Sequence, residues 1–249
     1  MGNSGKSYNM VDILKFVCAV GVVIIHTDPF IEVYAIDKFV TVFTRLCVPF
    51  FFLTTGFFCF RSDECGKIDN RRVLKTLKRL VILYVLATII YIPFCFRHTD
   101  MLNHARTFLV GGVGGGLWYL LALIFAVALI GILATFMRMK WIFVVSVAFF
   151  TAGTLLATYA PLFERFALFN KIHAINELFY NSRNGLFFGF VFVALGAVIK
   201  QYGVPKFSLP VSLTATAACV FVLAVECVLS VVIKAPNRSL FFIDRKSVV

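Results

Sequence analysis

The stretch DILKFVCAVGVVIIHTDPF, residues 12–30, decides the fold because it joins the length of a membrane-spanning helix to side chains that lipid disfavours. A span needs roughly 20 apolar residues. This one carries Asp12 and Lys15 near its start and His26 near its end. A charged group at the centre of a span costs about 2.5–3.5 kcal/mol on insertion scales, so such groups normally face the protein interior or a wet cavity.

Lys15 and His26 are predicted to share one face of this helix. They are eleven residues apart, which leaves their azimuths about 20° apart and separates them by about 16 Å along the axis. Asp12 precedes Lys15 by three residues and joins the same side. One interpretation is a cationic anchor and a base at two depths of one cavity. The alternatives are an interfacial pair of Asp12 with Lys15 and a His26 that hydrogen-bonds a neighbour at the helix end.

The composition indicates that the whole chain is an integral membrane protein. Of its 249 residues, 61% are hydrophobic and 14% are charged, and 30 are Phe, whereas globular domains are about 45–50% apolar. We therefore predict an all-α fold, a polytopic bundle of transmembrane helices. The seven cysteines form no CxxC pair, so no metal site is predicted. The predicted spans are about 11–30, 40–60, 77–96, 117–136, 141–160, 185–200 and 207–233.

The net charge of +12 does not indicate nucleic-acid binding, because the basic residues lie in short loops between the predicted spans. Such residues usually fix the orientation of a membrane protein. Residues 61–79 contain seven basic and three acidic residues. We therefore expect this loop, and the N-terminus two spans earlier, in the cytoplasm of a multi-pass protein of the cell membrane. The basic stretch 67–80, with Lys75 and Arg79, is predicted to hold anionic membrane lipids or to grip the phosphates of coenzyme A.

Four motifs in order resemble those of the acyltransferase-3 family of membrane acyltransferases. In the first span, a basic residue, ten further residues and a histidine correspond to Lys15 and His26. FTRLCVPFFFLTTGFF, residues 43–58, is similar to the second-span signature, with Arg45 before a Pro-Phe-Phe kink. LWYLLALI at 117–124 and RNGLFFGFVFVALGAVI at 183–199 resemble later signatures. The chain also resembles the transmembrane half of the membrane-bound serine racemases of vancomycin resistance.

The resemblance implies a single acyltransferase-3-like transmembrane domain over residues 1–249. The family has about ten spans of ordinary helical length, so the domain is expected to be incomplete at its C-terminus. The implied enzyme moves an acyl group, expected to be acetyl, from a cytoplasmic acyl-thioester to a hydroxyl acceptor such as a surface glycan or a lipid. His26 would be the general base. No cofactor is expected to stay bound, and acyl-CoA would be the co-substrate.

The resemblance also implies that cations bind the donor's phosphates or offset the developing oxyanion. Lys15, Arg45 and Arg79 stand at the matching motif positions, and Lys75 belongs to the same basic stretch as Arg79. The family usually has Arg where this chain has Lys15, and Lys lacks the planar fork that binds phosphate through two hydrogen bonds.

Two questions stay open at the level of the sequence. Arg45 could instead form a structural ion pair with Asp37 or Glu226, which lie in or beside neighbouring predicted spans. Polar residues along one helix face also suit a transporter-like module that passes a small solute such as an amino acid. Besides the acyltransferase and the transporter-like module, the third hypothesis for the function is an inactive, truncated remnant of an acyltransferase.

Overall fold

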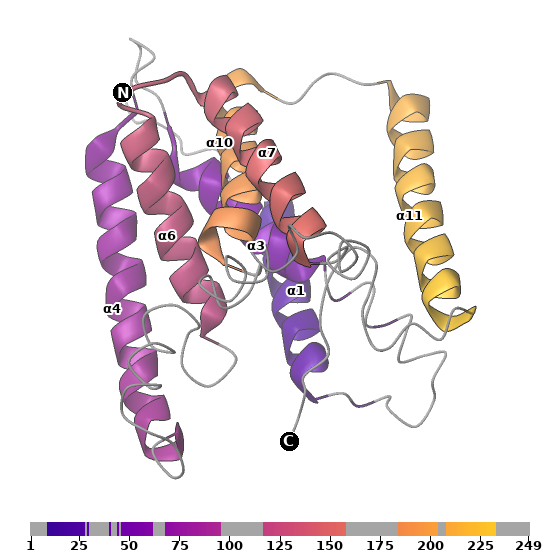
Figure 1. Ribbon diagram of the computed structural model, residues 1–249, viewed down its shortest axis with the longest axis horizontal. Coiled ribbons are helices and arrows are strands. Elements are labelled where there is room, and N and C mark those ends of the chain that lie inside the picture. Colours follow the sequence, from indigo (N-terminus) through magenta and orange to yellow (C-terminus); the bar gives the residue numbers. More distant parts are fainter. Residues whose placement is uncertain are drawn as a thin grey trace, which may run out of the picture.

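The computed structural model describes residues 9–27, 29, 40, 44, 46–61, 68–95, 117–157, 184–203 and 208–232, and these form helices and turns without a strand. The all-α prediction is confirmed for this part of the chain, and every helix overlaps a predicted span. In chain order the elements are α1 (Asn9–Thr27), α3 (Cys47–Cys59), α4 (Asn70–Cys95), α6 (Trp118–Leu133), α7 (Met139–Ala157), the π-helical turn η2 (Gly185–Gly189), α10 (Phe190–Tyr202) and α11 (Leu209–Val232) (Figure 1).

α3 and α10 are the central pair of the bundle and run antiparallel in close contact. A Cβ atom on Gly56 would lie 2.0 Å from the Val193 oxygen, and one on Gly196 would lie 2.0 Å from the Leu53 oxygen. The two glycines therefore let the two backbones touch. α6 and α7 also pack against α10, and α4 packs against α6. The core between these helices includes Phe52, Phe60, Val127, Ile130, Ile142, Phe190 and Val193.

The turn η2 leads into α10 and is fixed at its start by Asn184. The side-chain oxygen of Asn184 accepts hydrogen bonds from the backbone N–H groups of Leu186 and Phe187, at 3.0 and 2.9 Å. These are two of the N–H groups that a helix start leaves unpaired. The turn places the ring of Phe188 5.8 Å from that of Phe52. Asn184 thus anchors the aromatic packing between η2 and α3.

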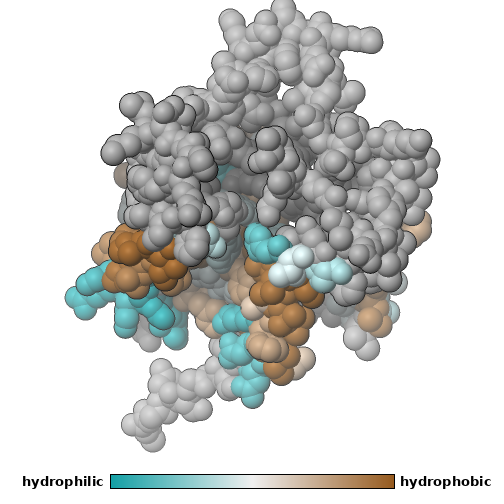
Figure 2. Space-filling model, turned by 90° about the horizontal axis from the view of Figure 1, so that it is seen from below, coloured by the Kyte–Doolittle hydropathy of each residue, from teal (hydrophilic) through white to brown (hydrophobic). Residues whose placement is uncertain are grey.

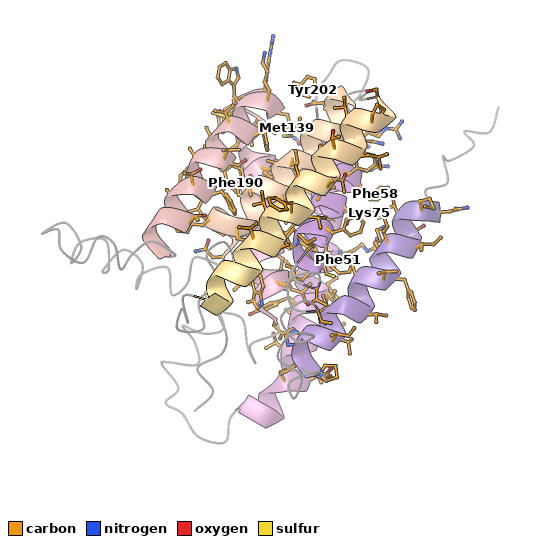
Figure 3. All side chains as sticks on the ribbon, turned by 90° about the vertical axis from the view of Figure 1, so that its right-hand side faces the viewer. Phe51, Phe58, Lys75, Met139, Phe190 and Tyr202 are labelled. Carbon is orange, nitrogen blue, oxygen red and sulfur yellow. The ribbon has the colours of Figure 1, made fainter. Side chains whose placement is uncertain are left out.

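Every Lys and Arg among the described residues lies toward one end of the bundle, here termed the basic end. Antiparallel packing brings the starts of α1, α4 and α7 together with the ends of α3, α6 and α10 (Figure 1). Met139 and Tyr202 mark this end in Figure 3. Such segregation is what the positive-inside rule describes for helices inserted in one orientation. The residues are Lys15, Arg61, Arg71, Arg72, Lys75, Lys78, Arg79, Arg138, Lys140 and Lys200.

By length and composition, one helical stretch among the described residues, Gly185–Tyr202, is long and apolar enough to cross a membrane. Shorter apolar helical segments are Cys47–Cys59, Trp118–Leu133, Met139–Thr154 and Pro210–Val222. The predicted basic stretch 67–80 and the span 77–96 are joined in one continuous helix, α4. α11 lies apart from the core in Figure 1, and its side chains from Pro210 to Val222 are exposed.

Candidate functional site

Two ammonium groups from different helices meet the end of α3 at the basic end of the bundle. Lys15 Nζ, from α1, lies 4.6 Å from the ring centroid of Phe58, and Lys200 Nζ, from α10, lies 4.6 Å from that of Phe57. The centroids of the two rings are 5.2 Å apart. Each cation–π contact contributes about 0.5–1 kcal/mol where it is exposed. The aromatic pair therefore receives one cation from each of two helices, and these four residues are termed the paired-lysine site.

Within the paired-lysine site, Lys15 has a carboxylate partner that is largely exposed. Lys15 Nζ donates to Asp12 Oδ1 at 3.2 Å, and the two side chains are 35% and 70% exposed. An exposed pair of this kind contributes only about 0–1 kcal/mol, so it can give way to another anion. Lys200 lies in the last turn of α10, where the helix dipole favours a cation. The Lys15 side of the site is therefore suited to an anionic ligand.

The face of α1 that carries Lys15 packs against α3. Lys15 and Cys18 are half-buried and Gly21 is buried, while Phe16 and Val23 on other sides of the helix are 71% and 59% exposed. A Cβ atom on Gly21 would lie 2.6 Å from Cys47 Sγ on α3. The small residues between Lys15 and His26 thus admit α3 close to α1.

Across this α1–α3 interface the side chains of Cys18 and Cys47 lie next to each other. Cys18 lies one turn beyond Lys15, on the face that continues toward His26. The contact fixes the register of α1 on α3 at a second point, beside that of Lys15 with Phe58.

His26 lies in the last turn of α1, and its side chain is exposed. The continuous helix from Asn9 to Thr27 places it on the side of Lys15, about 16 Å along the axis. The predicted shared face of the two residues therefore exists. Asp28, beside it in the sequence, lies outside the described residues.

Other predicted site residues do not join the paired-lysine site. Lys75 and Arg79 are exposed on α4, whose opposite face packs against α6. Their predicted contact with the donor stays a prediction. Arg45 and Asp37 lie outside the described residues, as does the side chain of Glu226.

A polar contact links α3 and α6 within the bundle. The hydroxyl of Tyr119 lies near the side chain of Thr55, whose own hydroxyl donates to the Phe51 oxygen at 2.9 Å. At the basic end, Gln201 Oε1 is buried and lacks a hydrogen-bond partner among the described residues. An acceptor is therefore available next to Lys200. Within the described residues, no cluster of three or more His, Cys, Asp or Glu side chains could hold a metal ion.

Sequence reasoning missed Lys200 as a site residue. It closes the sixth predicted span and was counted only for the orientation of its loop. The available signal was its place one turn beyond Gly196, because a glycine in a helix often marks a close approach to a second helix. Only the register of α10 on α3 pairs it with Phe57.

Comparison with known proteins now decides the family. The profile of the acyltransferase-3 family, described as an acyltransferase domain, matches residues 8–243. The chain belongs to the acyltransferase-3 family. Members of this family are membrane proteins, and membership supports a transferase activity of the acyltransferase class.

Curated relatives of this acyltransferase-3 member carry other names. An amino-acid racemase of Enterococcus faecalis is 28% identical over 207 residues, which are 79% of this chain and 28% of that protein. A serine/alanine racemase of Enterococcus gallinarum is 24% identical over 202 residues, 77% of this chain and 29% of that protein. The chain thus spans less than a third of the length of these relatives. No solved structure matches it.

Proposed function

We propose that this chain is a multi-pass membrane acyltransferase that moves an acyl group, expected to be acetyl, from a cytoplasmic acyl-thioester to a hydroxyl acceptor. The observation that carries the proposal is the paired-lysine site, where Lys15 and Lys200 contact neighbouring rings at the end of α3 in a member of the acyltransferase-3 family. The donor we propose is acyl-CoA, whose phosphate groups are anions that ammonium groups such as those of Lys15 and Lys200 bind. The acceptor is proposed to be a surface glycan or a lipid.

The proposed orientation puts the basic end in the cytoplasm. All described Lys and Arg residues lie toward that end, and the positive-inside rule assigns such an end to the cytoplasmic side. The N-terminus would then be cytoplasmic as well, because α1 begins there. The paired-lysine site would face the compartment that supplies coenzyme A thioesters.

In the proposed reaction, His26 acts as general base about 16 Å from Lys15 along α1. Its imidazole takes the proton of the acceptor hydroxyl, and the hydroxyl oxygen attacks the thioester carbonyl carbon. The tetrahedral intermediate expels coenzyme A as a thiolate, which takes up the proton held by His26, and the O-acyl ester is released. With the phosphates held by Lys15 and Lys200, the flexible arm of the donor would extend along α1 toward His26. An imidazole suits this role because its pKa lies near working pH.

The test uses membranes that contain the full chain, incubated with acetyl-CoA labelled in the acetyl group. Label is followed into the glycan and lipid fractions. His26→Ala is expected to lower transfer by about 10²–10⁴-fold, the usual contribution of a general base. Thr27→Ala is the matched control, because Thr27 is a neighbouring exposed residue whose hydroxyl donates to the Val23 oxygen of its own helix at 3.1 Å. Equal transfer by the two variants would refute the role of His26.

A second candidate function comes from the names of the relatives. Two of them are named for amino-acid racemisation, so a transmembrane module that passes an amino acid to such a protein is a coherent alternative. Polar side chains along one helix face would line that path. An uptake assay distinguishes transport from acyl transfer. Proteoliposomes that contain the chain in their membrane are given labelled serine. Uptake of serine without consumption of acetyl-CoA would favour transport, and transfer of label from acetyl-CoA would favour the acyltransferase.

A further inference from the structure

The first turns of α4 carry their cations on the face turned away from the bundle. Val73, Tyr84 and Thr88 are 4–5% exposed, and Leu77 and Leu80 pack against the core. These positions follow one stripe of the helix. The exposed cations between them are Arg71, Arg72, Lys75, Lys78 and Arg79. At 100° per residue the five fall within an arc of roughly 120° on the opposite side of α4.

The same outward face becomes apolar immediately after these cations. Ile82, Leu86, Ile89 and Ile90 continue it and are 49–66% exposed. Seen along the bundle from its other end, hydrophilic surface gathers beside hydrophobic surface on the α4 side of the molecule (Figure 2). A cationic segment that changes to an apolar one along the axis matches the passage from lipid headgroups to acyl chains.

The charge of this face is not balanced within the described residues. The ion pair that the described residues form joins Lys15 to Asp12, and both of these residues lie on α1 and not on α4. The nearest acid in the sequence, Asp69, uses Oδ1 to accept the backbone N–H groups of Arg71 and Arg72, at 3.1 and 3.4 Å. No carboxylate of the described residues lies within salt-bridge distance of the five side chains. Their counter-anion must therefore come from elsewhere.

We infer that the outward face of α4, formed by Arg71, Arg72, Lys75, Lys78 and Arg79, binds the headgroups of anionic phospholipids. Lys and Arg near an anionic bilayer surface attract such lipids. The apolar residues that follow lie where the acyl chains of the bound lipids run. This partner is separate from the donor proposed for the paired-lysine site, which lies on α1, α3 and α10.

The experiment places the purified chain in phosphatidylcholine nanodiscs with spin-labelled phosphatidylglycerol or spin-labelled phosphatidylcholine. The motionally restricted fraction of each label gives its relative association with the protein. The expected result is a preference for phosphatidylglycerol that falls about fivefold for each cation removed. Lys75→Gln with Arg79→Gln should therefore lower the preference about 25-fold.

A matched control removes the same charge from the same end of the bundle. Arg138→Gln with Lys140→Gln neutralises two exposed cations at the turn between α6 and α7 and should change the preference much less. If both double variants lost the preference for phosphatidylglycerol equally, the preference would come from the overall positive charge of this end of the bundle. That result would overturn the proposed site on α4. The charge-conserving double variant Lys75→Arg with Arg79→Lys should keep the preference for phosphatidylglycerol. A loss of preference in this variant as well would indicate misfolding and not the removal of charge.

A competition experiment distinguishes binding of a lipid headgroup from binding of the acyl donor at this face of α4. Excess acetyl-CoA and excess inorganic phosphate should leave the restricted phosphatidylglycerol fraction unchanged. Displacement by acetyl-CoA would assign this face to the donor and overturn the inference. Failure of the acyl-transfer assay would not affect the lipid result, because the nanodisc measurement needs no turnover.

Discussion

The contact between α3 and α10 yields a sharp prediction for Gly56→Ala. The added Cβ would lie 2.0 Å from the backbone oxygen of Val193, whereas ordinary contacts begin at 3.4 Å, so the helices must separate by about 1.4 Å. Neither partner can yield by rotating a side chain, because the obstruction is backbone. Overpacking of a core costs about 1–3 kcal/mol, and the clash with backbone places this site at the upper end. Replacing Gly by Ala within a helix raises the free energy of unfolding by about 0.5–1 kcal/mol, because Ala loses less backbone entropy on folding. We expect a net destabilisation of about 2 kcal/mol.

The assay is reversible unfolding of the purified chain in detergent micelles, followed by helical circular dichroism. Gly131→Ala on α6 is the control, because among the described residues its Cβ would meet only the side-chain atom Val73 Cγ1, at 3.1 Å. That variant should lose little or gain up to about 1 kcal/mol. Equal stability of Gly56→Ala and Gly131→Ala would refute the close approach of α3 and α10. The contact of Lys200 with Phe57 should weaken together with stability in Gly56→Ala.

The other predictions concern the site and its supports. Lys200→Gln should raise KM for acetyl-CoA about fivefold to tenfold with little change in kcat, since one charge-assisted contact of about 1–1.5 kcal/mol is lost; an unchanged KM would remove Lys200 from the donor site. A mild oxidant should cross-link Cys18 to Cys47, as peptide mass spectrometry would show, and a link to Cys59 in place of Cys47 would contradict the register of α1. Asn184→Ala should lower the free energy of unfolding by about 1 kcal/mol in the same micelle assay, and wild-type stability would show that the cap is not needed.

The location of the helices was accessible from the sequence because long apolar runs need no partner to be recognised. Each of the seven predicted spans overlaps a helix of the described residues, although the ends differ. The boundary within α4 was not accessible. A basic amphipathic segment and an apolar segment were read as two elements, yet nothing between Asn70 and Cys95 breaks the helix before Pro93, and the structure continues α4 through both.

The candidate site divides in the same way. The shared face of Lys15 and His26 follows from helical periodicity alone, since it depends on residues of one helix. The partner of that face does not, because α3 lies against it through Cys47 and Phe58. For Lys75 and Arg79, periodicity already placed them opposite the apolar stripe of Val73, Leu77 and Leu80. That this stripe packs against α6 came only from the structure.

The sequence by itself determined the class of the protein, the position of its helices, its family motifs and the end of the bundle that carries positive charge. These properties depend on local hydropathy, periodicity and charge, which are summed along the chain. Only the tertiary structure decided that Lys15 and Lys200 contact the neighbouring rings of Phe58 and Phe57, and that the Val73 side of α4 packs against α6. Both results depend on which helix faces touch, and close backbone contacts such as those at Gly56 and Gly196 set that choice.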